Sequence, residues 1–266
     1  MTAIPGRLHL QEPDAWLETL HWPGAAPEAL ILLHEGLGSA RLWRDVPQAL
    51  AAQTGLPAFA YSRLGYGDSD PCPLPRPLDY MAREAALLPQ ILDHALDQTS
   101  ARRAILIGHS DGASIAALYG AKADPRVIGL VLIAPHFFVE DISIRAIQTA
   151  RDAYENGALR RRLARHHADP DAAFRGWNDA WLDPEFRGWD ITACLAQIPV
   201  PILAVQGRDD PYGTPAQVHV IADHARTKPQ IHLLEACKHA RHLDQPEATL
   251  ALISDFARRL AGSEPD

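Results

Sequence analysis

The residues with the clearest potential for chemistry are Gly-His-Ser-Asp-Gly at positions 108–112. The apolar run 104–107 before them is typical of a buried strand, and the small residues 113–118 after them suit a helix. A serine between a strand and a helix, with glycine two residues away on each side, is the pattern of a nucleophile elbow, which exposes the serine hydroxyl. The pattern therefore predicts that Ser110 is a nucleophile; the alternative is an ordinary turn with an idle serine.

A serine hydroxyl needs a general base, and the base needs an acid that orients it. In enzymes with this elbow, the acid and then the histidine follow the serine along the chain. The apolar run 201–206 leads into Gly207-Arg208-Asp209-Asp210-Pro211, and a carboxylate after such a strand lies at the same sheet edge as the elbow. Asp210 is the preferred acid, with Asp209 as its competitor.

The candidate base lies in Cys-Lys-His-Ala-Arg-His at 237–242, which follows the predicted strand 230–234. His239 is preferred because it is nearer to that strand, and His242 is expected to dock the loop or to begin the last helix. The two histidines also have the spacing of a metal-binding pair, but no third ligand is evident. No metal site is therefore predicted.

An oxyanion hole would complete this machinery with two backbone N–H groups. One comes from the residue after the nucleophile, which is Asp111, and the second from the loop after an early strand. The run His-Glu-Gly-Leu-Gly-Ser at 34–39 is that loop, because it follows the apolar run 29–33. Gly36 is the preferred donor, and Leu37 is the second choice.

Two acidic side chains, Glu35 and Asp111, accompany the predicted oxyanion hole. Negative charge that faced the hole would oppose the charge of the oxyanion. We expect both side chains to point away from it, one of them paired with Arg63 or with a neighbouring histidine. In the alternative, one of them is protonated at neutral pH and donates a hydrogen bond to the substrate.

The elements that must position these residues form an alternating pattern. Short apolar runs, typical of strands buried on both faces of a parallel sheet, alternate with helical patterns. The predicted strands are 29–33, 58–61, 104–107, 127–134, 201–206 and 230–234, and the predicted helices are 41–53, 79–98, 111–122, 214–225 and 246–261. The fold class is therefore α/β, a doubly wound, mostly parallel sheet. Within the first 28 residues, 7–10 and 15–21 are expected to form an antiparallel hairpin.

One stretch interrupts the alternation, because more than sixty mostly helical residues separate the strands that end near 134 and begin near 201. This is too long for a simple crossover, so we predict a helical cap at 137–190 on a core made of 1–136 and 191–266. Trp177 and Trp181 of the cap either pack it onto the core or form an aromatic wall over the substrate. The arginine run 160–162 and the nearby Arg165, His166 and His167 are expected to form a solvated helix face.

His136 and Phe137 follow the strand before the cap, where they either line the pocket or hold the hinge of the cap. The full set of possible substrate-binding residues is Glu35, Leu37, His136, Phe137, Trp177 and Trp181.

Composition limits the function classes. The chain has 266 residues and a net charge of −8, which makes nucleic acid an unfavourable partner. The first residues have no signal-peptide pattern, the apolar runs are too short to span a membrane, and three widely spaced cysteines suit reduced thiols. We expect a cytoplasmic protein that acts on a small molecule without a cofactor; the sequence does not predict an oligomeric state.

Over nearly its whole length the chain resembles enzymes of the α/β-hydrolase fold. The matching segments are the loop 34–39, Arg-Leu-Gly-Tyr-Gly-Asp-Ser at 63–69, the elbow 108–112, the acid loop 207–211 and His239. The resemblance implies a triad of Ser110, Asp210 and His239. Many relatives have glycine at the position of Glu35 and an apolar or amide residue at that of Asp111, which leaves the role of these acids open.

The resemblance, together with the aromatic residues of the cap, implies a hydrolase for a small carboxylic ester, thioester or lactone that carries an apolar or aromatic part. Members of this fold also hydrolyse C–C bonds of diketone-like substrates, oxygenate heteroaromatic compounds without a cofactor, or bind small ligands as receptors. These three functions remain alternatives. Dehalogenases and epoxide hydrolases generally have aspartate at the centre of the elbow, so Ser110 argues against them.

Overall fold

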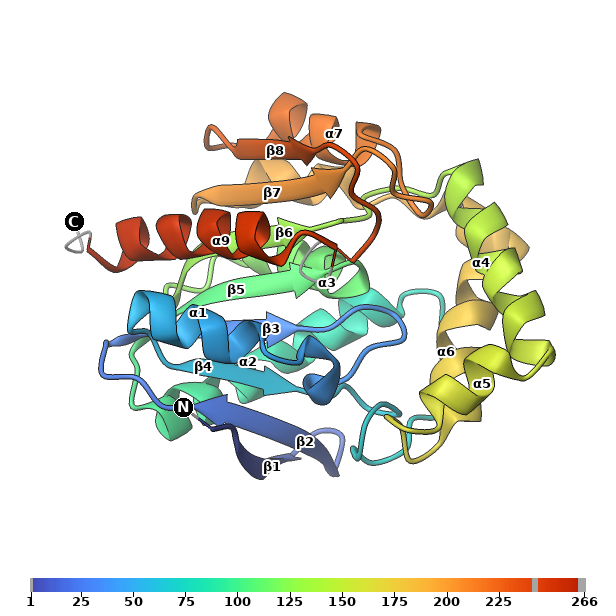
Figure 1. Ribbon diagram of the computed structural model, residues 1–266, viewed down its shortest axis with the longest axis horizontal. Helices are drawn as coiled ribbons and strands as arrows, with labels where there is room; N and C mark the ends of the chain where they lie inside the picture. Colours follow the sequence, from blue (N-terminus) through green and yellow to red (C-terminus); the bar gives the residue numbers. More distant parts are fainter. Residues whose placement is uncertain (1, 241–243, 263–266) are drawn as a thin grey trace.

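The computed structural model describes residues 2–240 and 244–262, and within them it contains one eight-stranded sheet (Figure 1). The strand order is β1-β2-β4-β3-β5-β6-β7-β8. The strands are β1 Ile4–Leu10, β2 Ala15–Trp22, β3 Glu28–Leu33, β4 Ala58–Tyr61, β5 Arg103–His109, β6 Val127–Ile133, β7 Ile202–Gly207 and β8 Gln230–Leu234. The first two strands form the predicted hairpin, which joins β4 in antiparallel orientation, and the remaining pairs are parallel. The predicted α/β fold class is thus confirmed.

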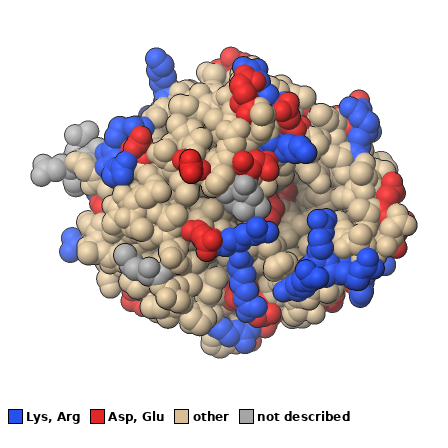
Figure 2. All heavy atoms as spheres, viewed as in Figure 1, with Lys and Arg blue, Asp and Glu red and all other residues tan. Residues whose placement is uncertain are grey.

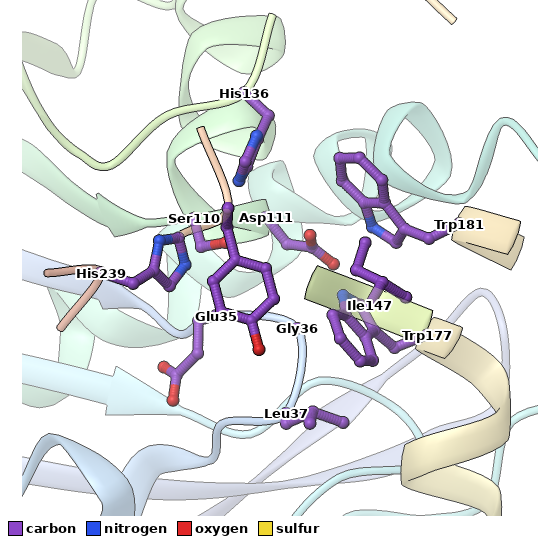
Figure 3. A pocket seen from close by; sticks show the side chains of 11 residues that line it. Glu35, Gly36, Leu37, Ser110, Asp111, His136, Ile147, Trp177, Trp181 and His239 are labelled. Carbon is purple, nitrogen blue, oxygen red and sulfur yellow. The ribbon is translucent and has the colours of Figure 1, made fainter. Parts of the chain in front are cut away.

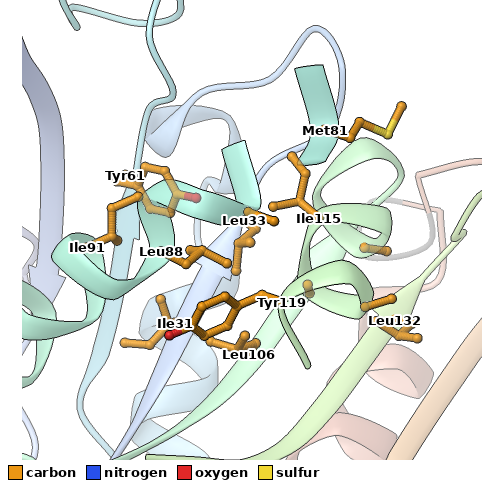
Figure 4. Packing of buried hydrophobic residues seen from close by; sticks show 14 of the residues in the cluster. Ile31, Leu33, Tyr61, Met81, Leu88, Ile91, Leu106, Ile115, Tyr119 and Leu132 are labelled. Atoms are coloured by element: carbon orange, nitrogen blue, oxygen red, sulfur yellow. The ribbon is translucent and has the colours of Figure 1, made fainter. Parts of the chain in front are cut away.

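Helices cover both faces of the sheet. They are α2 Tyr80–Thr99 and α3 Asp111–Gly120 on one face, and α1 Val46–Thr54 and α9 Pro246–Ala261 on the other. Successive side chains of a strand point to opposite faces, so Ile31 and Leu33 of β3 pack with α2 and α3 (Figure 4). Their neighbours Leu30 and Leu32 pack with α1 and α9. Two apolar cores therefore hold the carboxyl ends of the parallel strands in fixed positions.

The helix predicted at 41–53 differs from the observed structure. A short 3-10 helix, η1 at Ala40–Trp43, is followed by α1, and Arg44 between them has φ 52°. A left-handed residue cannot continue a right-handed helix, so the chain turns there. The helix α7, at Ala216–His224, follows β7 and lies within its predicted range.

The insertion between β6 and β7 consists of α4 Asp141–Glu155, α5 Ala158–Leu163, α6 Pro170–Leu182 and the 3-10 helices η2 Pro184–Gly188 and η3 Thr192–Gln197. Figure 1 shows α4, α5 and α6 beyond the carboxyl ends of the strands. Phe138 and Asp190 form an antiparallel bridge at the base of this insertion, and the Ile191 N–H donates to the Phe137 carbonyl at 2.8 Å. We therefore propose a cap of 137–190 on a core of 1–136 and 191–266.

Candidate active site

The backbone at Ser110 has the strained conformation of an elbow, with φ 53° and ψ −120°. The glycines on either side allow the turn, because a Cβ at Gly108 would lie 2.2 Å from the Gly112 carbonyl oxygen. A Cβ at Gly112 would lie 2.1 Å from the Leu33 carbonyl oxygen. Ser110 is thus held at the carboxyl edge of the sheet, directly before α3. A strained backbone of this kind is typical of functional sites.

The acid and the base of the predicted triad are in contact. His239 Nδ1 lies 2.9 Å from both carboxylate oxygens of Asp210. The buried Asp210 also accepts hydrogen bonds from Gln206 Nε2 at 3.0 Å and from the Tyr212 N–H at 2.9 Å. Asp209 is exposed, and its N–H donates to the Cys237 carbonyl at 3.1 Å. The geometry therefore favours Asp210 as the acid over Asp209.

The candidate base is also fixed through its backbone. His109 Nε2 lies 3.0 Å from the His239 carbonyl oxygen, to which it donates. His109 is the residue before the candidate nucleophile, so this bond joins the elbow to the loop that carries the base. His242, the other histidine considered as base, lies outside the described residues.

The predicted oxyanion loop, residues 34–39, is held by a buried histidine and a buried arginine. His34 Nε2 accepts from the Arg63 N–H at 3.0 Å, so Nδ1 carries the proton and donates to the Glu35 carbonyl at 2.7 Å. Arg63 Nη2 donates to the same carbonyl at 2.9 Å. Burial, and next the charge of Arg63, hold the pKa of His34 well below its usual value. His34 is therefore neutral at pH 7 and suits its role as an acceptor.

The N–H groups of the candidate oxyanion donors have no partner in the part of the chain that the structure describes. Among residues 2–240 and 244–262, no hydrogen-bond acceptor is bound to the N–H groups of Gly36, Leu37 or Asp111. The indole ring of Trp177 lies against Gly36, where a Cβ would be 2.3 Å from its Nε1. The loop therefore requires glycine at this position, and its N–H groups are available to an oxyanion.

His167 connects the insertion to this loop. The prediction of a solvated face was wrong for this residue, because its side chain is buried. His167 Nδ1 accepts from the Gly67 N–H at 3.0 Å, so Nε2 donates to the Leu37 carbonyl at 3.1 Å. The arginines at 160–162 are exposed, as predicted. Figure 2 shows basic side chains over α5 beside a hollow in the surface.

Asp111 is fully buried and belongs to a polar cluster behind the elbow. Tyr80 donates its hydroxyl to Asp111 Oδ2 at 2.6 Å, and Trp181 Nε1 donates to the Tyr80 oxygen at 3.0 Å. Burial, and then the charge of Asp111, raise the pKa of Tyr80 well above its usual value, so Tyr80 keeps its proton. Arg63 Nη1 lies 3.8 Å from Oδ2, which is the arginine pairing that the sequence suggested.

Glu35, within the predicted oxyanion loop, carries the second of the two acidic side chains. Its Oε2 lies 3.5 Å from His109 Nδ1, so it has a neighbouring histidine, as the sequence also suggested. Both Glu35 and Asp111 nevertheless line the same cavity, and Glu35 is one of the possible substrate-binding residues predicted from the sequence.

The buried pair of Arg63 and Asp111 leads to a prediction about stability. Arg63→Met should lower the free energy of unfolding by about 3–5 kcal/mol, because it leaves a buried carboxylate without its counter-charge. Arg83→Met is the matched control, since Arg83 and Asp79 form an exposed ion pair worth less than about 1 kcal/mol. Urea unfolding measures both changes. Equal losses in the two variants would contradict a structural role for the buried pair.

The cavity beside Ser110 has an empty volume of about 440 Å³, its open mouth included. It is lined by Glu35, Gly36, Leu37, Ser110, Asp111, His136, Ile147, Trp177, Trp181, Tyr212 and His239 (Figure 3). Five of the six predicted substrate-binding residues are in this set. The expectation for Phe137 was wrong: its side chain is fully buried in the apolar core, and its N–H donates to Gln217 Oε1 at 2.7 Å. Phe137 instead belongs to the hinge of the insertion.

Sequence reasoning missed three residues of the site. Ile147 lies on the buried face of α4, and the buried positions 143, 147, 150 and 154 are the helical spacing that could have indicated it. The Tyr212 ring lies 4.7 Å from that of His239, and Gln206 supports Asp210 from within β7. For Gln206 the available signal was a polar residue at the end of an apolar strand.

Comparison with known proteins identifies the family. A model described as "Alpha/beta hydrolase family" matches residues 30–252, which is most of the chain. The chain belongs to the alpha/beta hydrolase family. An abhydrolase domain-containing protein of Schizosaccharomyces pombe is 29% identical over 113 residues, which cover 42% of this chain and 39% of that protein. The match thus spans well under half of this curated relative.

Solved structures show the same fold at low sequence identity. The 2-hydroxy-6-oxo-6-phenylhexa-2,4-dienoate hydrolase of Rhodococcus sp. strain RHA1 is similar with a TM-score of 0.75 and 16% identity, over 97% of this chain and 99% of that one. The enol-lactonase of Burkholderia xenovorans LB400 is similar with a TM-score of 0.71 and 17% identity, over 91% of this chain and 96% of that one. No described helix is both long enough and apolar enough to cross a membrane.

Proposed function

We propose that this family member is a serine hydrolase that cleaves a small carboxylic ester, thioester or lactone through an acyl-enzyme. The observation that carries the proposal is the contact of His239 with the buried Asp210, beside a cavity that is also lined by Ser110 on its strained elbow. Carboxylate-oriented histidine beside a serine is the arrangement that activates a hydroxyl for acyl transfer. The cavity with its aromatic walls suits the apolar or aromatic part of such a substrate.

In the proposed mechanism, His239 removes the Ser110 proton as the oxygen attacks the carbonyl carbon. Asp210 keeps the Nδ1 proton on the imidazole and stabilises the imidazolium. The N–H groups of Gly36 and Asp111 bind the oxyanion, and His239 returns the proton to the leaving group. Water, activated by His239, then releases the acid and frees Ser110. These steps use only side chains, backbone groups and water, and we propose that they take place in the cytoplasm.

Hydrolysis of p-nitrophenyl acetate, butyrate and octanoate tests the proposal. We expect turnover with a preference for the shorter acyl chains because the cavity is small, and an initial burst of about one nitrophenol per enzyme where deacylation is slow. Thioester and lactone forms of the best acyl group then identify the bond. Absence of turnover on all of them, with cleavage of a vinylogous 1,5-diketone, would assign C–C hydrolysis in its place. Tight retention of a ligand without turnover would indicate a receptor.

A further inference from the structure

One oxygen of Asp111 has an unusual position. Asp111 is fully buried and lines the cavity beside Ser110. Its Oδ1 has no hydrogen-bond partner among the described residues, whereas Tyr80 donates to Oδ2. A buried acceptor without a partner is costly, by about 1–3 kcal/mol, and is therefore uncommon in native proteins. This oxygen is consequently a candidate to bind a group that is not part of the chain.

The surroundings of Asp111 determine which kind of group it can bind. Arg63 Nη1 lies 3.8 Å from Oδ2, so a buried positive charge already balances the carboxylate. An ammonium group at Oδ1 would lose its hydration, and the only negative charge beside it is already neutralised by Arg63. A neutral hydrogen-bond donor, of which a hydroxyl is the simplest, can instead bind at Oδ1 without that cost. The balanced charge thus favours a hydroxyl over an ammonium group.

The arrangement of the site indicates where on the substrate this hydroxyl lies. Figure 3 shows His239 on one side of Ser110 and the Asp111 carboxylate on the other, where it faces Ile147, Trp177 and Trp181. In acyl transfer the leaving group must lie next to the histidine that protonates it. The acyl chain therefore extends away from His239, past the Asp111 carboxylate and into the aromatic part of the cavity.

We propose that Asp111 is a specificity-determining residue whose Oδ1 accepts a hydrogen bond from a hydroxyl on the acyl chain, so that the substrates are esters or thioesters of hydroxy acids. The proposal rests on the proposed hydrolase function. In it Asp111 has two roles: the backbone N–H binds the oxyanion, and the side chain recognises the acyl group. A site built to bind a hydroxyl discriminates strongly against an analogue that lacks it, because the buried acceptor then has no partner.

Paired substrates test this inference. The value of kcat/KM is measured for p-nitrophenyl butyrate and for its 2-hydroxy and 3-hydroxy derivatives. For the wild type, we expect kcat/KM for the better hydroxy ester to be about 10- to 100-fold higher than kcat/KM for p-nitrophenyl butyrate. This is the range that a hydrogen bond to a charged acceptor provides. Asp111→Asn should lower this ratio about tenfold, because the amide oxygen is needed to accept from Tyr80 and the NH₂ group then replaces Oδ1 as the partner of the substrate hydroxyl.

Tyr80→Phe is the matched control, since it removes the hydrogen bond to Oδ2 and leaves Oδ1 unchanged. It should preserve the ratio of kcat/KM for the hydroxy ester to kcat/KM for the butyrate ester, even if both values change. If Asp111→Asn, like Tyr80→Phe, lowers kcat/KM equally for both esters and keeps their ratio, Asp111 only positions Arg63 and Tyr80. The inference is then overturned. A wild type without preference for either hydroxy ester overturns it as well, and leaves the hydrolase function intact.

A binding experiment separates this inference from the proposed function. If the wild type hydrolyses none of the three esters, the hydrolase proposal fails, and binding to Ser110→Ala decides the inference. Methyl butyrate and methyl 3-hydroxybutyrate are then compared as ligands by titration calorimetry. Binding of the hydroxy ester at least tenfold tighter than that of butyrate supports recognition by Asp111. Equal affinities overturn it.

Discussion

Ser110→Ala is expected to lower kcat for p-nitrophenyl butyrate by about 10⁶-fold. The change removes the only atom that forms the acyl-enzyme in the proposed mechanism. Some acceleration over water should persist, because the N–H groups of Gly36 and Asp111 still stabilise an oxyanion formed by attack of water. Single-turnover kinetics would also lack the nitrophenol burst.

Ser39→Ala provides a matched control for this experiment. Ser39 lies at the end of the oxyanion loop, is fully buried, and has a hydroxyl without a hydrogen-bond partner among the described residues. Its loss should therefore change kcat by less than about threefold, and both variants should keep the wild-type unfolding temperature. If Ser110→Ala retained more than about one per cent of the activity, attack by water or by another residue would replace the acyl-enzyme mechanism.

The fold could be predicted because its signal is local. The central strands are buried on both faces, so each is a short, almost continuous apolar run that differs clearly from the helical spacing around it. Left-handed backbone at a single residue carries no such signal. The break at Arg44 was missed for this reason, since arginine is not a residue that marks a turn.

The candidate site could be predicted where chain order and strand ends limit the choices, as they do for Ser110, Asp210 and His239. The partners of these residues come from distant segments. His34 binds Arg63, and Phe137 binds Gln217 eighty positions away. Such contacts decide which of two adjacent side chains faces the cavity. The sequence alone therefore could not show that His136 lines the cavity and Phe137 does not. The choice between Asp209 and Asp210 also depends on which side chain is buried. The sequence does not show this for two adjacent residues of the same type.

That choice leads to the second large effect. Asp210→Asn should lower kcat by about 10⁴-fold with little change in KM. Both oxygens of Asp210 accept hydrogen bonds, Oδ2 from Gln206 Nε2 and Oδ1 from the Tyr212 N–H, and His239 Nδ1 lies 2.9 Å from each of them. An asparagine must turn its NH₂ group toward one of these donors, because it has only one acceptor oxygen.

Either orientation of the asparagine harms the base. If the NH₂ group faces Gln206 or Tyr212, two donors oppose each other and displace the side chain. His239 Nδ1 lies 2.9 Å from both positions, so the same NH₂ group can also donate to Nδ1; the imidazole proton then moves to Nε2, which cannot accept the Ser110 proton. The imidazolium also loses its counter-charge in both cases. A steady-state comparison at one pH, with unfolding temperatures to confirm the fold, measures the effect.

Asp209→Asn is the control that makes the result specific. The two substitutions are chemically identical and adjacent, but Asp209 is exposed and contacts the Cys237 carbonyl only through its backbone N–H. Its replacement should therefore leave kcat within about twofold of the wild type, as expected for a surface substitution. The reverse outcome, a large loss for Asp209→Asn and a small one for Asp210→Asn, would assign the acid to Asp209. Equal and small losses would mean that His239 acts as the base without help from either carboxylate, and the proposed role of Asp210 would then be wrong.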